Sequence, residues 1–171
     1  MIRETEIGDI EAVAQIYGEA VMTGTASFET EAPGIEGMTE RFLVLKEKGY
    51  PYYSAVVDDR VVGFSFAGPY RARQAYNNTV ENAIYVDSAY HGRGIARLLM
   101  ERLIESCTAK GFRQMVAVVG DSRNSGSINL HRSLGFHITG TLHSVGYKHG
   151  RWLDVLFMQR ALGDGDHSAP G

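Results

Sequence analysis

The chain has 171 residues, of which 44% are hydrophobic and 22% charged, and its formal net charge is -3 at pH 7. These values are ordinary for one globular domain with a substantial core, and the weak negative charge argues against a nucleic-acid partner. A single cysteine, Cys107, excludes an internal disulfide and a Cys-based zinc site, and we expect it to be a buried thiol. Because no apolar run approaches membrane-spanning length and the first residues lack a secretory signal pattern, we expect a cytoplasmic protein without a membrane partner.

The first half of the chain is predicted to form a strand, two helices and a hairpin. Residues 1–7 favour a short strand, and Asp9 is a candidate cap for a helix whose apolar residues recur at helical spacing. A turn-rich loop, "TGTASFETEAPG", leads to a second helix over residues 35–48. Residues 52–69 contain two β-favouring runs around an Asp-Asp-Arg turn, which predicts a hairpin.

The second half alternates strands and helices. Residues 79–87 predict a strand, and an apolar stripe at helical spacing predicts the following helix, which ends at Gly111. The almost continuous apolar run of "RQMVAVVG" indicates a strand that is buried on both faces. "NSGSINLHRSLGF" is a short helix ended by Gly135, and two late strands near 136–147 and 151–161 surround a "KHGRW" turn.

This order of elements predicts a mixed α/β sheet with helices on both sides, and with its most buried strands around the long helix. No internal repeat or linker divides the chain, so we expect one domain over residues 1–162. The segment 163–171 has almost nothing to bury, and we expect a disordered tail.

Two glycines and an arginine stand directly before the long helix, in "HGRGIARLL". A helix N-terminus presents unpaired backbone N–H groups and the positive end of the helix dipole, and glycines let a phosphate approach that backbone. Arg93 adds a charge that can pair with a phosphate. For the motif alone, a tight turn without a ligand stays open as an explanation. The absence of a following Gly-Lys-Ser/Thr disfavours a nucleotide triphosphatase, and the absence of G-x-G-x-x-G disfavours a dinucleotide fold.

Two further sets of polar residues are candidates for a binding site. Asn124, Ser127 and His131 are spaced i, i+3 and i+7, so they share one face of the short helix, which contacts either a polar ligand or solvent. Arg71 and Arg73 alternate along a segment that we expect to be extended. Two guanidinium groups on one side suit a small dianionic end, although simple solvation of two surface arginines is the alternative.

The segment "VDSAYHGRGIARLLMERLIE" resembles the pyrophosphate-binding signature of the GNAT N-acetyltransferases, Gln/Arg-x-x-Gly-x-Gly/Ala. His91 departs from the usual Gln or Arg, and Ala96 is an accepted variant. "NSGSINLHRSLGF" resembles the later motif of that family, in which an Asn opens a short helix ending in Gly-Phe. The resemblance narrows to the branch that acetylates phosphinothricin, methionine sulfoximine or methionine sulfone, and it is carried by "TGTASFETEAP", "AGPYRARQAY", "VENAIYV", "NLHRSLGF" and "GTLHSVGYKHGRWLDVLFMQ".

The resemblance implies a GNAT fold, with a mostly antiparallel twisted sheet of about seven strands flanked by about four helices. It also implies that a splayed parallel strand pair binds acetyl-CoA. The residues then implied in cofactor binding are Ile84, Tyr85, Val86, His91, Gly92, Arg93, Gly94, Ile95, Ala96, Arg97, Asn124 and Ser127. We expect no metal, because the remaining histidines lack the spacing of a metal site.

The resemblance further implies direct acetyl transfer from acetyl-CoA to the α-amino group of a small amino-acid-like substrate. In this interpretation Glu81 is the general base, and His131 is a proton relay or the acid that protonates the thiolate. Considered alone, Glu81 fits a strand-edge carboxylate and His131 a helix histidine packed at the edge of the core. The residues implied in substrate binding are Phe28, Arg71, Arg73 and Tyr76.

Two other functions remain open from the sequence. One is a peptide or protein N-terminal acetyltransferase on the same fold, and the other is a non-catalytic sensor module that binds acyl-CoA. The branch resemblance also implies a homodimer with the late strands near the interface.

Overall fold

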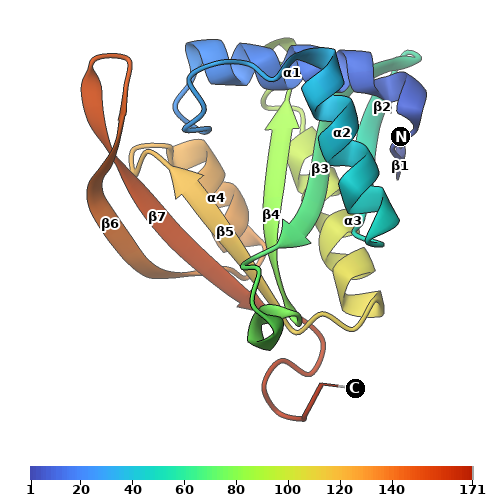
Figure 1. The fold of residues 1–171 in the computed structure, drawn as a ribbon, viewed down its shortest axis with the longest axis vertical. Helices are drawn as coiled ribbons and strands as arrows, with labels where there is room; N and C mark the ends of the chain where they lie inside the picture. Colours follow the sequence, from blue (N-terminus) through green and yellow to red (C-terminus); the bar gives the residue numbers. More distant parts are fainter. Residues whose placement is uncertain (171) are drawn as a thin grey trace.

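A single seven-stranded sheet forms the centre of the computed structural model, which describes residues 1–170 (Figure 1). The strands are β1 (Ile2–Glu4), β2 (Tyr52–Val57), β3 (Arg60–Pro69), β4 (Thr79–Val86), β5 (Gln114–Gly120), β6 (His137–Lys148) and β7 (Arg151–Ala161). Their spatial order is β1-β2-β3-β4-β5-β7-β6, and all neighbours are antiparallel except β4 and β5. The mostly antiparallel mixed sheet that the sequence predicted is confirmed.

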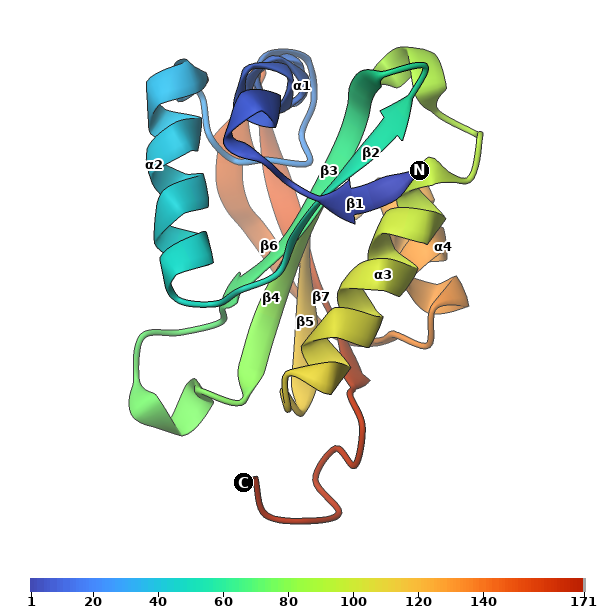
Figure 2. The same ribbon diagram turned by 90° about the vertical axis from the view of Figure 1, so that its right-hand side faces the viewer.

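Helices cover both faces of this sheet, with α1 and α2 on one side and α3 and α4 on the other (Figure 2). They are α1 (Ile10–Thr23), α2 (Gly34–Glu47), α3 (Ile95–Ala109) and α4 (Ser125–Ser133), with one-turn 3₁₀ helices η1 (Ile7–Asp9), η2 (Gln74–Tyr76) and η3 (Ser88–Tyr90). The buried stripes of α1 and α2 pack on Tyr52 and Phe64, whereas the stripe of α3 packs with Met115 of β5. Cys107 belongs to this second core and is 0% exposed, so the prediction of a buried thiol is confirmed.

Asp9 does not cap α1 as the sequence predicted, because its side chain makes no capping hydrogen bond to that helix. Its carboxylate instead accepts hydrogen bonds from the Arg3 guanidinium at 2.6 and 2.7 Å and from the Glu6 backbone N–H at 2.9 Å. Burial opposes ionisation, yet these bonds hold the pKa of Asp9 below its usual value. The hairpin formed as expected: Asp58 and Asp59 have φ of 47° and 59°, which suits the two-residue turn between β2 and β3.

β4 and β5 pair over only part of their length. The register joins Thr79–Asn82 to Gln114–Ala117, although β4 continues to Val86 and β5 to Gly120. Beyond this register the two strands diverge, as Figure 1 shows. The predicted splayed parallel pair is therefore confirmed, and the facing backbone groups in the gap do not pair with each other.

The loop over residues 24–28 lies against the end of β5 and against β6, at two glycines. A Cβ added at Gly120 would lie 2.6 Å from the carbonyl oxygen of Thr25, which is backbone and cannot easily move. A Cβ added at Gly146 would collide with the ring of Phe28. The loop therefore reaches its position only because both strands present bare backbone there.

The "KHGRW" turn holds this loop through polar contacts. The Lys148 ammonium is buried and donates to the carbonyl oxygen of Ser27 at 2.8 Å. His149 Nε2 donates to the carbonyl oxygen of Gly24 at 3.2 Å. This part of the turn therefore has a structural role in positioning the loop.

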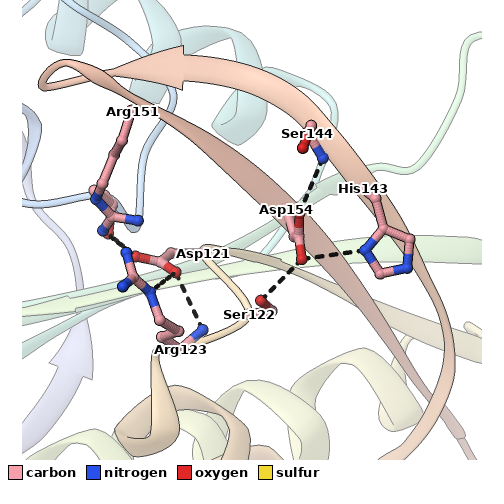
Figure 3. A network of polar contacts seen from close by, with 8 residues as sticks. Asp121, Ser122, Arg123, His143, Ser144, Arg151 and Asp154 are labelled. Atoms are coloured by element: carbon pink, nitrogen blue, oxygen red, sulfur yellow. Dashed lines mark hydrogen bonds and ion pairs between the residues drawn. The ribbon is translucent and has the colours of Figure 1, made fainter.

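Two aspartates join the end of β5 to the β6–β7 hairpin (Figure 3). Asp121 accepts hydrogen bonds from the Arg151 guanidinium, the Arg123 backbone N–H at 3.1 Å and the Thr25 hydroxyl at 3.0 Å. Burial opposes ionisation, but these donors lower the pKa of Asp121 to about 2. Asp154 makes a second set of contacts, with the Ser144 backbone N–H (2.9 Å), His143 Nδ1 (3.2 Å) and the Ser122 hydroxyl (3.2 Å).

After β7 the chain turns and lies against Arg113. The Arg113 guanidinium donates to the carbonyl oxygens of Gly165 at 3.2 Å and Ala169 at 2.9 Å. The domain limit at residue 162 and the disorder of the segment that follows stay predictions. Over residues 1–170, no helix is both long enough and apolar enough to cross a membrane.

Candidate active site

Two glycines in the left-handed region shape the turn between β4 and α3. Gly92 has φ of 75° and Gly94 has φ of 79°, and a Cβ at either position would meet nothing within 4 Å, so backbone conformation and not crowding favours glycine here. Buried Ile95 and then Ala96 open α3 directly afterwards. Among the described residues, the backbone N–H groups of 92–97 find no backbone or side-chain acceptor. With the positive end of the α3 dipole behind them, these groups fit a pyrophosphate.

The side chains of this turn make local contacts. His91 Nε2 donates to the Val86 carbonyl oxygen at 2.9 Å, so the ring folds back onto the end of β4. The Arg93 guanidinium lies 4.8 Å from the ring centroid of Tyr90, and Arg97 forms an ion pair within α3. The backbone of the turn is therefore a better candidate for anion binding than these side chains, which accounts for the tolerance of His91 in the motif.

A small cavity of about 50 Å³ lies in the gap between β4 and β5. Ser127 and His131 of α4 and Asn124, which directly precedes this helix, line one side of it together, as their spacing on one helix face predicted. Asn124 also caps α4, because its Oδ1 accepts the Ser127 backbone N–H at 3.2 Å. The other lining residues are Ala26, Asn82, Ile84, Tyr85, Ala117, Val118, Val119 and Gly120. The size of this cavity suits a narrow group such as an acetyl.

His131 is buried at this cavity, with 2% of its surface exposed. Its Nδ1 lies 2.8 Å from the carbonyl oxygen of Ser127, which can only accept, so Nδ1 carries a proton. Nε2 lies 3.2 Å from the side-chain amide of Asn82, and the Phe136 ring packs edge-on at 5.0 Å. Burial lowers the pKa of His131, opposed by the Ser127 carbonyl, so the neutral ring is favoured at neutral pH.

Glu81 stands next to Asn82 on β4, and because side chains alternate along a strand it faces the opposite side of the sheet. On that side Glu81 forms part of the wall of a pocket of about 360 Å³ between α1, α2, β3 and β4. Burial raises the pKa of Glu81 above its usual value, and the positive charge of Arg71 opposes this effect. A partly buried carboxyl with a raised pKa is suited to accept a proton near neutral pH.

The two hollows adjoin at β4. Asn82 and Tyr85 line both of them, so a group held in the β4–β5 gap is next to the pocket that Glu81 lines. The site therefore offers one proton acceptor, Glu81, on one side of the strand and one buried imidazole, His131, on the other. Over residues 1–170, no three His, Cys, Asp or Glu side chains gather in a way that could hold a metal ion.

Arg71 and Arg73 are not arranged as the sequence predicted. The chain bends at 72–73 and enters η2 instead of continuing as an extended segment, so the two side chains do not alternate along a strand. The Arg71 guanidinium stacks 4.5 Å from the ring centroid of Tyr70, and its charge acts on Glu81. Arg73 is exposed immediately before η2.

Tyr76 and Phe28 lie on different sides of the site. Tyr76 packs edge-on against Tyr70 at 5.6 Å and lines a groove of about 540 Å³ that also includes Val116, the register partner of Glu81. Phe28 is 36% exposed and lies in the loop held against Gly146. The structure therefore places Tyr76 in this third hollow, whose wall includes the neighbour of Glu81 on β5, and Phe28 at the β6–β7 hairpin.

Two polar residues of the site were not predicted from the sequence. Arg41 of α2 lines the Glu81 pocket, pairs with Glu29 at 2.7 Å and lies 5.9 Å from the Tyr17 ring centroid. No local pattern distinguishes it from other surface arginines, because only the packing of α2 on the sheet brings it to the pocket. Asn82 carried a weak signal, since a polar residue beside Glu81 in a strand that is otherwise apolar must face the buried side.

Comparison with known proteins agrees with this geometry. The acetyltransferase (GNAT) family matches residues 13–136. The chain is 40% identical over 169 residues to a phosphinothricin N-acetyltransferase of Alcaligenes faecalis, which covers 99% of this chain and 86% of that relative. It is 36% identical over 170 residues to an L-methionine sulfoximine/L-methionine sulfone acetyltransferase of Pseudomonas paraeruginosa, covering 99% and 98% of the two chains.

A solved structure is similar over the whole fold. The crystal structure of a GNAT superfamily phosphinothricin acetyltransferase from Sinorhizobium meliloti in complex with AcCoA matches with a TM-score of 0.98 and 40% identity, covering 100% of this chain and 92% of that one. The family match and these relatives span the β4–α3 turn, the β4–β5 gap and α4. The chain therefore belongs to the acetyltransferase (GNAT) family, and it is an N-acetyltransferase with acetyl-CoA as its acetyl donor.

Proposed function

We propose that this enzyme acetylates the α-amino group of a small amino-acid-like compound by direct transfer in the cytoplasm. The acceptor is of the phosphinothricin, methionine sulfoximine or methionine sulfone type, since relatives named for those activities match nearly the whole chain. The observation that carries the proposal is Glu81, a partly buried carboxyl with a raised pKa in the wall of a pocket beside the β4–β5 gap.

Backbone groups hold the donor in this proposal. The N–H groups of residues 92–97 bind the pyrophosphate, and Arg93 adds positive charge nearby. The backbone of β4 pairs with the pantetheine arm in the gap, mainly at Ile84 and at the N–H of Val86. The Val86 carbonyl already accepts a hydrogen bond from His91, and the backbone groups of Tyr85 point toward β3, as those of Asp87 do. Acetyl-CoA supplies the activated acetyl group, and the chain orients it next to Glu81.

Glu81 prepares the acceptor. An α-amino group is largely protonated at neutral pH, so it is attracted to the carboxylate and must lose a proton before its nitrogen can attack. Arg71 and Arg73 receive the anionic end of the acceptor in this proposal. Tyr76 bounds the acceptor from the groove beside Tyr70, and Phe28 bounds it from the side of the β6–β7 hairpin. The position of Arg71 beside Glu81 supports this arrangement, because an α-amino acid carries its amine and carboxylate close together.

His131 handles the second proton. Once the new C–N bond has formed, the nitrogen has one more proton to lose and the sulfur of the departing CoA needs one. A buried, neutral imidazole at the gap is suited to take the proton from the nitrogen and to supply a proton to the sulfur.

Glu81→Gln tests this proposal. We expect kcat with methionine sulfoximine to fall by about a hundredfold or more, because general-base catalysis typically contributes at least that much. The affinity for acetyl-CoA, measured by calorimetry, should be unchanged, since Glu81 faces away from the turn at 92–97. Glu36→Gln, a matched change at an exposed carboxylate of α2, should leave turnover unaltered. Unchanged turnover in Glu81→Gln would remove this residue from the mechanism.

We further propose that the enzyme is a homodimer that associates through the β6–β7 hairpin. β6 is an edge strand of the sheet, and large apolar side chains are exposed along the hairpin. They are Ile138, Leu142, Val145, Tyr147 and Trp152. A second copy of the chain covers this surface in the proposal, in agreement with the expectation from the branch resemblance.

A further inference from the structure

Asn82 makes an incomplete contact with His131. The Asn82 side chain is 8% exposed, and its oxygen Oδ1 lies 3.2 Å from His131 Nε2. Its nitrogen Nδ2 is buried and has no hydrogen-bond partner among the described residues. Leaving a buried amide donor unpaired is destabilising, and folded proteins rarely do so.

The position of the proton on His131 determines whether Nε2 needs a hydrogen-bond donor or an acceptor as its partner. The Ser127 carbonyl fixes that proton on Nδ1, so in the neutral ring Nε2 has a lone pair and no proton. A lone pair facing the amide oxygen is repulsive. A rotation of the Asn82 amide by half a turn exchanges the positions of Oδ1 and Nδ2. Nδ2 then donates a hydrogen bond to the lone pair of Nε2, so both atoms gain a partner.

The protonated ring requires the opposite orientation. When both nitrogens of His131 carry protons, Nδ1 donates to the Ser127 carbonyl and Nε2 donates to the Asn82 oxygen. Within residues 1–170, no charged group competes at the ring: Glu81 lies on the other face of β4, Asp121 is bonded to Arg151, and Arg132 is exposed. The two orientations of one amide therefore match the two protonation states of one imidazole.

We propose that Asn82 is a positioning residue that keeps His131 hydrogen-bonded in both states, as a donor to the neutral ring and as an acceptor from the protonated ring. This inference rests on the proposed role of His131 as a relay and makes its direction explicit. In the resting enzyme Nε2 holds a lone pair, so His131 accepts a proton before it gives one.

The proton balance is then complete. The first proton of the ammonium group goes to Glu81 and from there to solvent. The nitrogen then bonds to the acetyl carbonyl carbon and loses its second proton to Nε2, and the Asn82 amide turns to accept the new N–H. The electron pair of the breaking C–S bond moves to sulfur, which takes the proton from Nε2. The amide turns back, and His131 is neutral again for the next cycle.

Nuclear magnetic resonance of the whole chain labelled with ¹⁵N-histidine tests the resting state without any turnover. The His131 signal is identified by its loss in His131→Gln. At neutral pH we expect a protonated Nδ1 and an unprotonated, hydrogen-bonded Nε2. A proton on Nε2 at neutral pH, with or without one on Nδ1, overturns the proposal.

Two variants test the exchange of roles. Asn82→Asp presents only hydrogen-bond acceptors to the ring. The titration midpoint of His131 should therefore rise by about one pH unit or more, because an adjacent carboxylate favours the protonated imidazole. Asn129→Asp, on the exposed side of α4, is the matched control and should not move that midpoint. Asn82→Leu can neither donate nor accept, so kcat should fall about tenfold or more while KM for acetyl-CoA stays the same.

An unmoved midpoint in Asn82→Asp, or an unaltered kcat in Asn82→Leu, contradicts the role of Asn82. These failures are distinct from failure of the proposed function. If the unmodified enzyme acetylates no amino-acid acceptor, the proposed function is wrong, while the resonance measurement still decides which proton His131 carries.

Discussion

At the scale of single residues, the charge of Arg71 acts on the ionisation of Glu81, and Glu81 is the more buried of the two. Burial raises the pKa of Glu81, and the exposed Arg71 stacked on Tyr70 opposes that rise with its charge. The ionised carboxylate is the form that accepts a proton, so turnover decreases as pH falls through the raised pKa. The acid limb of kcat/KM should therefore lie above the range in which an ordinary carboxyl titrates.

Arg71→Gln should move this acid limb to still higher pH. Removing this positive charge takes away the effect of Arg71 that opposes burial at Glu81, so the pKa of that carboxyl rises further. The measurement is kcat/KM as a function of pH with methionine sulfoximine as acceptor. Arg73→Gln is the control: its charge does not act on Glu81, so KM for the acceptor should rise while the limb stays in place. An unmoved limb in Arg71→Gln would show that the two charges are not coupled.

The sequence marks only those site residues whose chemistry is visible locally. Gly92, Gly94 and His131 stand in motifs with fixed spacing, so they could be predicted from the amino-acid sequence alone. Arg41 could not be singled out, because its importance depends on which helix covers the sheet. Asn82 carried only a weak signal, because its contact with His131 depends on which strand face meets α4. Such long-range packing leaves no periodic signal in the chain.

At the scale of elements, the loop over residues 24–28 depends on the strands beneath it. A Cβ at Gly120 would meet the carbonyl oxygens of Thr25 at 2.6 Å and Ala26 at 2.9 Å. Ala26 and Gly120 both line the cavity in the β4–β5 gap. The fit of this loop on β5 therefore helps to close the site.

Gly120→Ala should lower the free energy of unfolding by about 1–3 kcal/mol, because the added methyl group overpacks against fixed backbone atoms. Gly140→Ala in β6 is the matched control, since a Cβ there meets nothing within 4 Å and φ is not positive. Urea denaturation of both variants measures the difference. Equal stability of the two variants would mean that the loop is not held in this position.

Elements with a clear hydrophobic period were predictable, and those decided by a single side-chain contact were not. The period of two along β4 and the helical stripe of α3 determine both elements locally. Asp9 bonds to Arg3 instead of capping α1, and the segment after Tyr70 bends into η2 instead of extending. In both places a specific polar or aromatic contact overrides the local preference.

At the scale of the whole molecule, one sheet separates two functions. α1 and α2 cover one face, and α3 and α4 cover the other (Figure 2). Glu81 and its pocket lie on the first face, and His131 lies on the second. The two hollows adjoin at β4, so in the proposed mechanism a donor in the gap meets an acceptor from the other side. The β6–β7 hairpin lies at the edge of the sheet and exposes several large apolar side chains.

Trp152→Glu should convert the proposed homodimer to a monomer. Trp152 is 64% exposed and packs edge-on against Tyr147 at 5.2 Å, so a carboxylate there places charge in the apolar surface at the turn end of the hairpin. Light scattering after size exclusion gives the mass of each variant. Leu43→Glu, at an exposed leucine of α2, is the control and should leave the mass unchanged. A monomeric unmodified enzyme, or a dimeric Trp152→Glu variant, would refute the interface.

The central claim is acetyl transfer to the free α-amino group of a small amino-acid-like compound. The most direct measurement is thiol release from acetyl-CoA with methionine sulfoximine or phosphinothricin, compared with the same compounds already acetylated on nitrogen and with a short peptide. We expect rapid release with the free amino acids, none with the blocked compounds and little with the peptide. Release with the peptide alone, or release that is unaffected by blocking the amine, would contradict it.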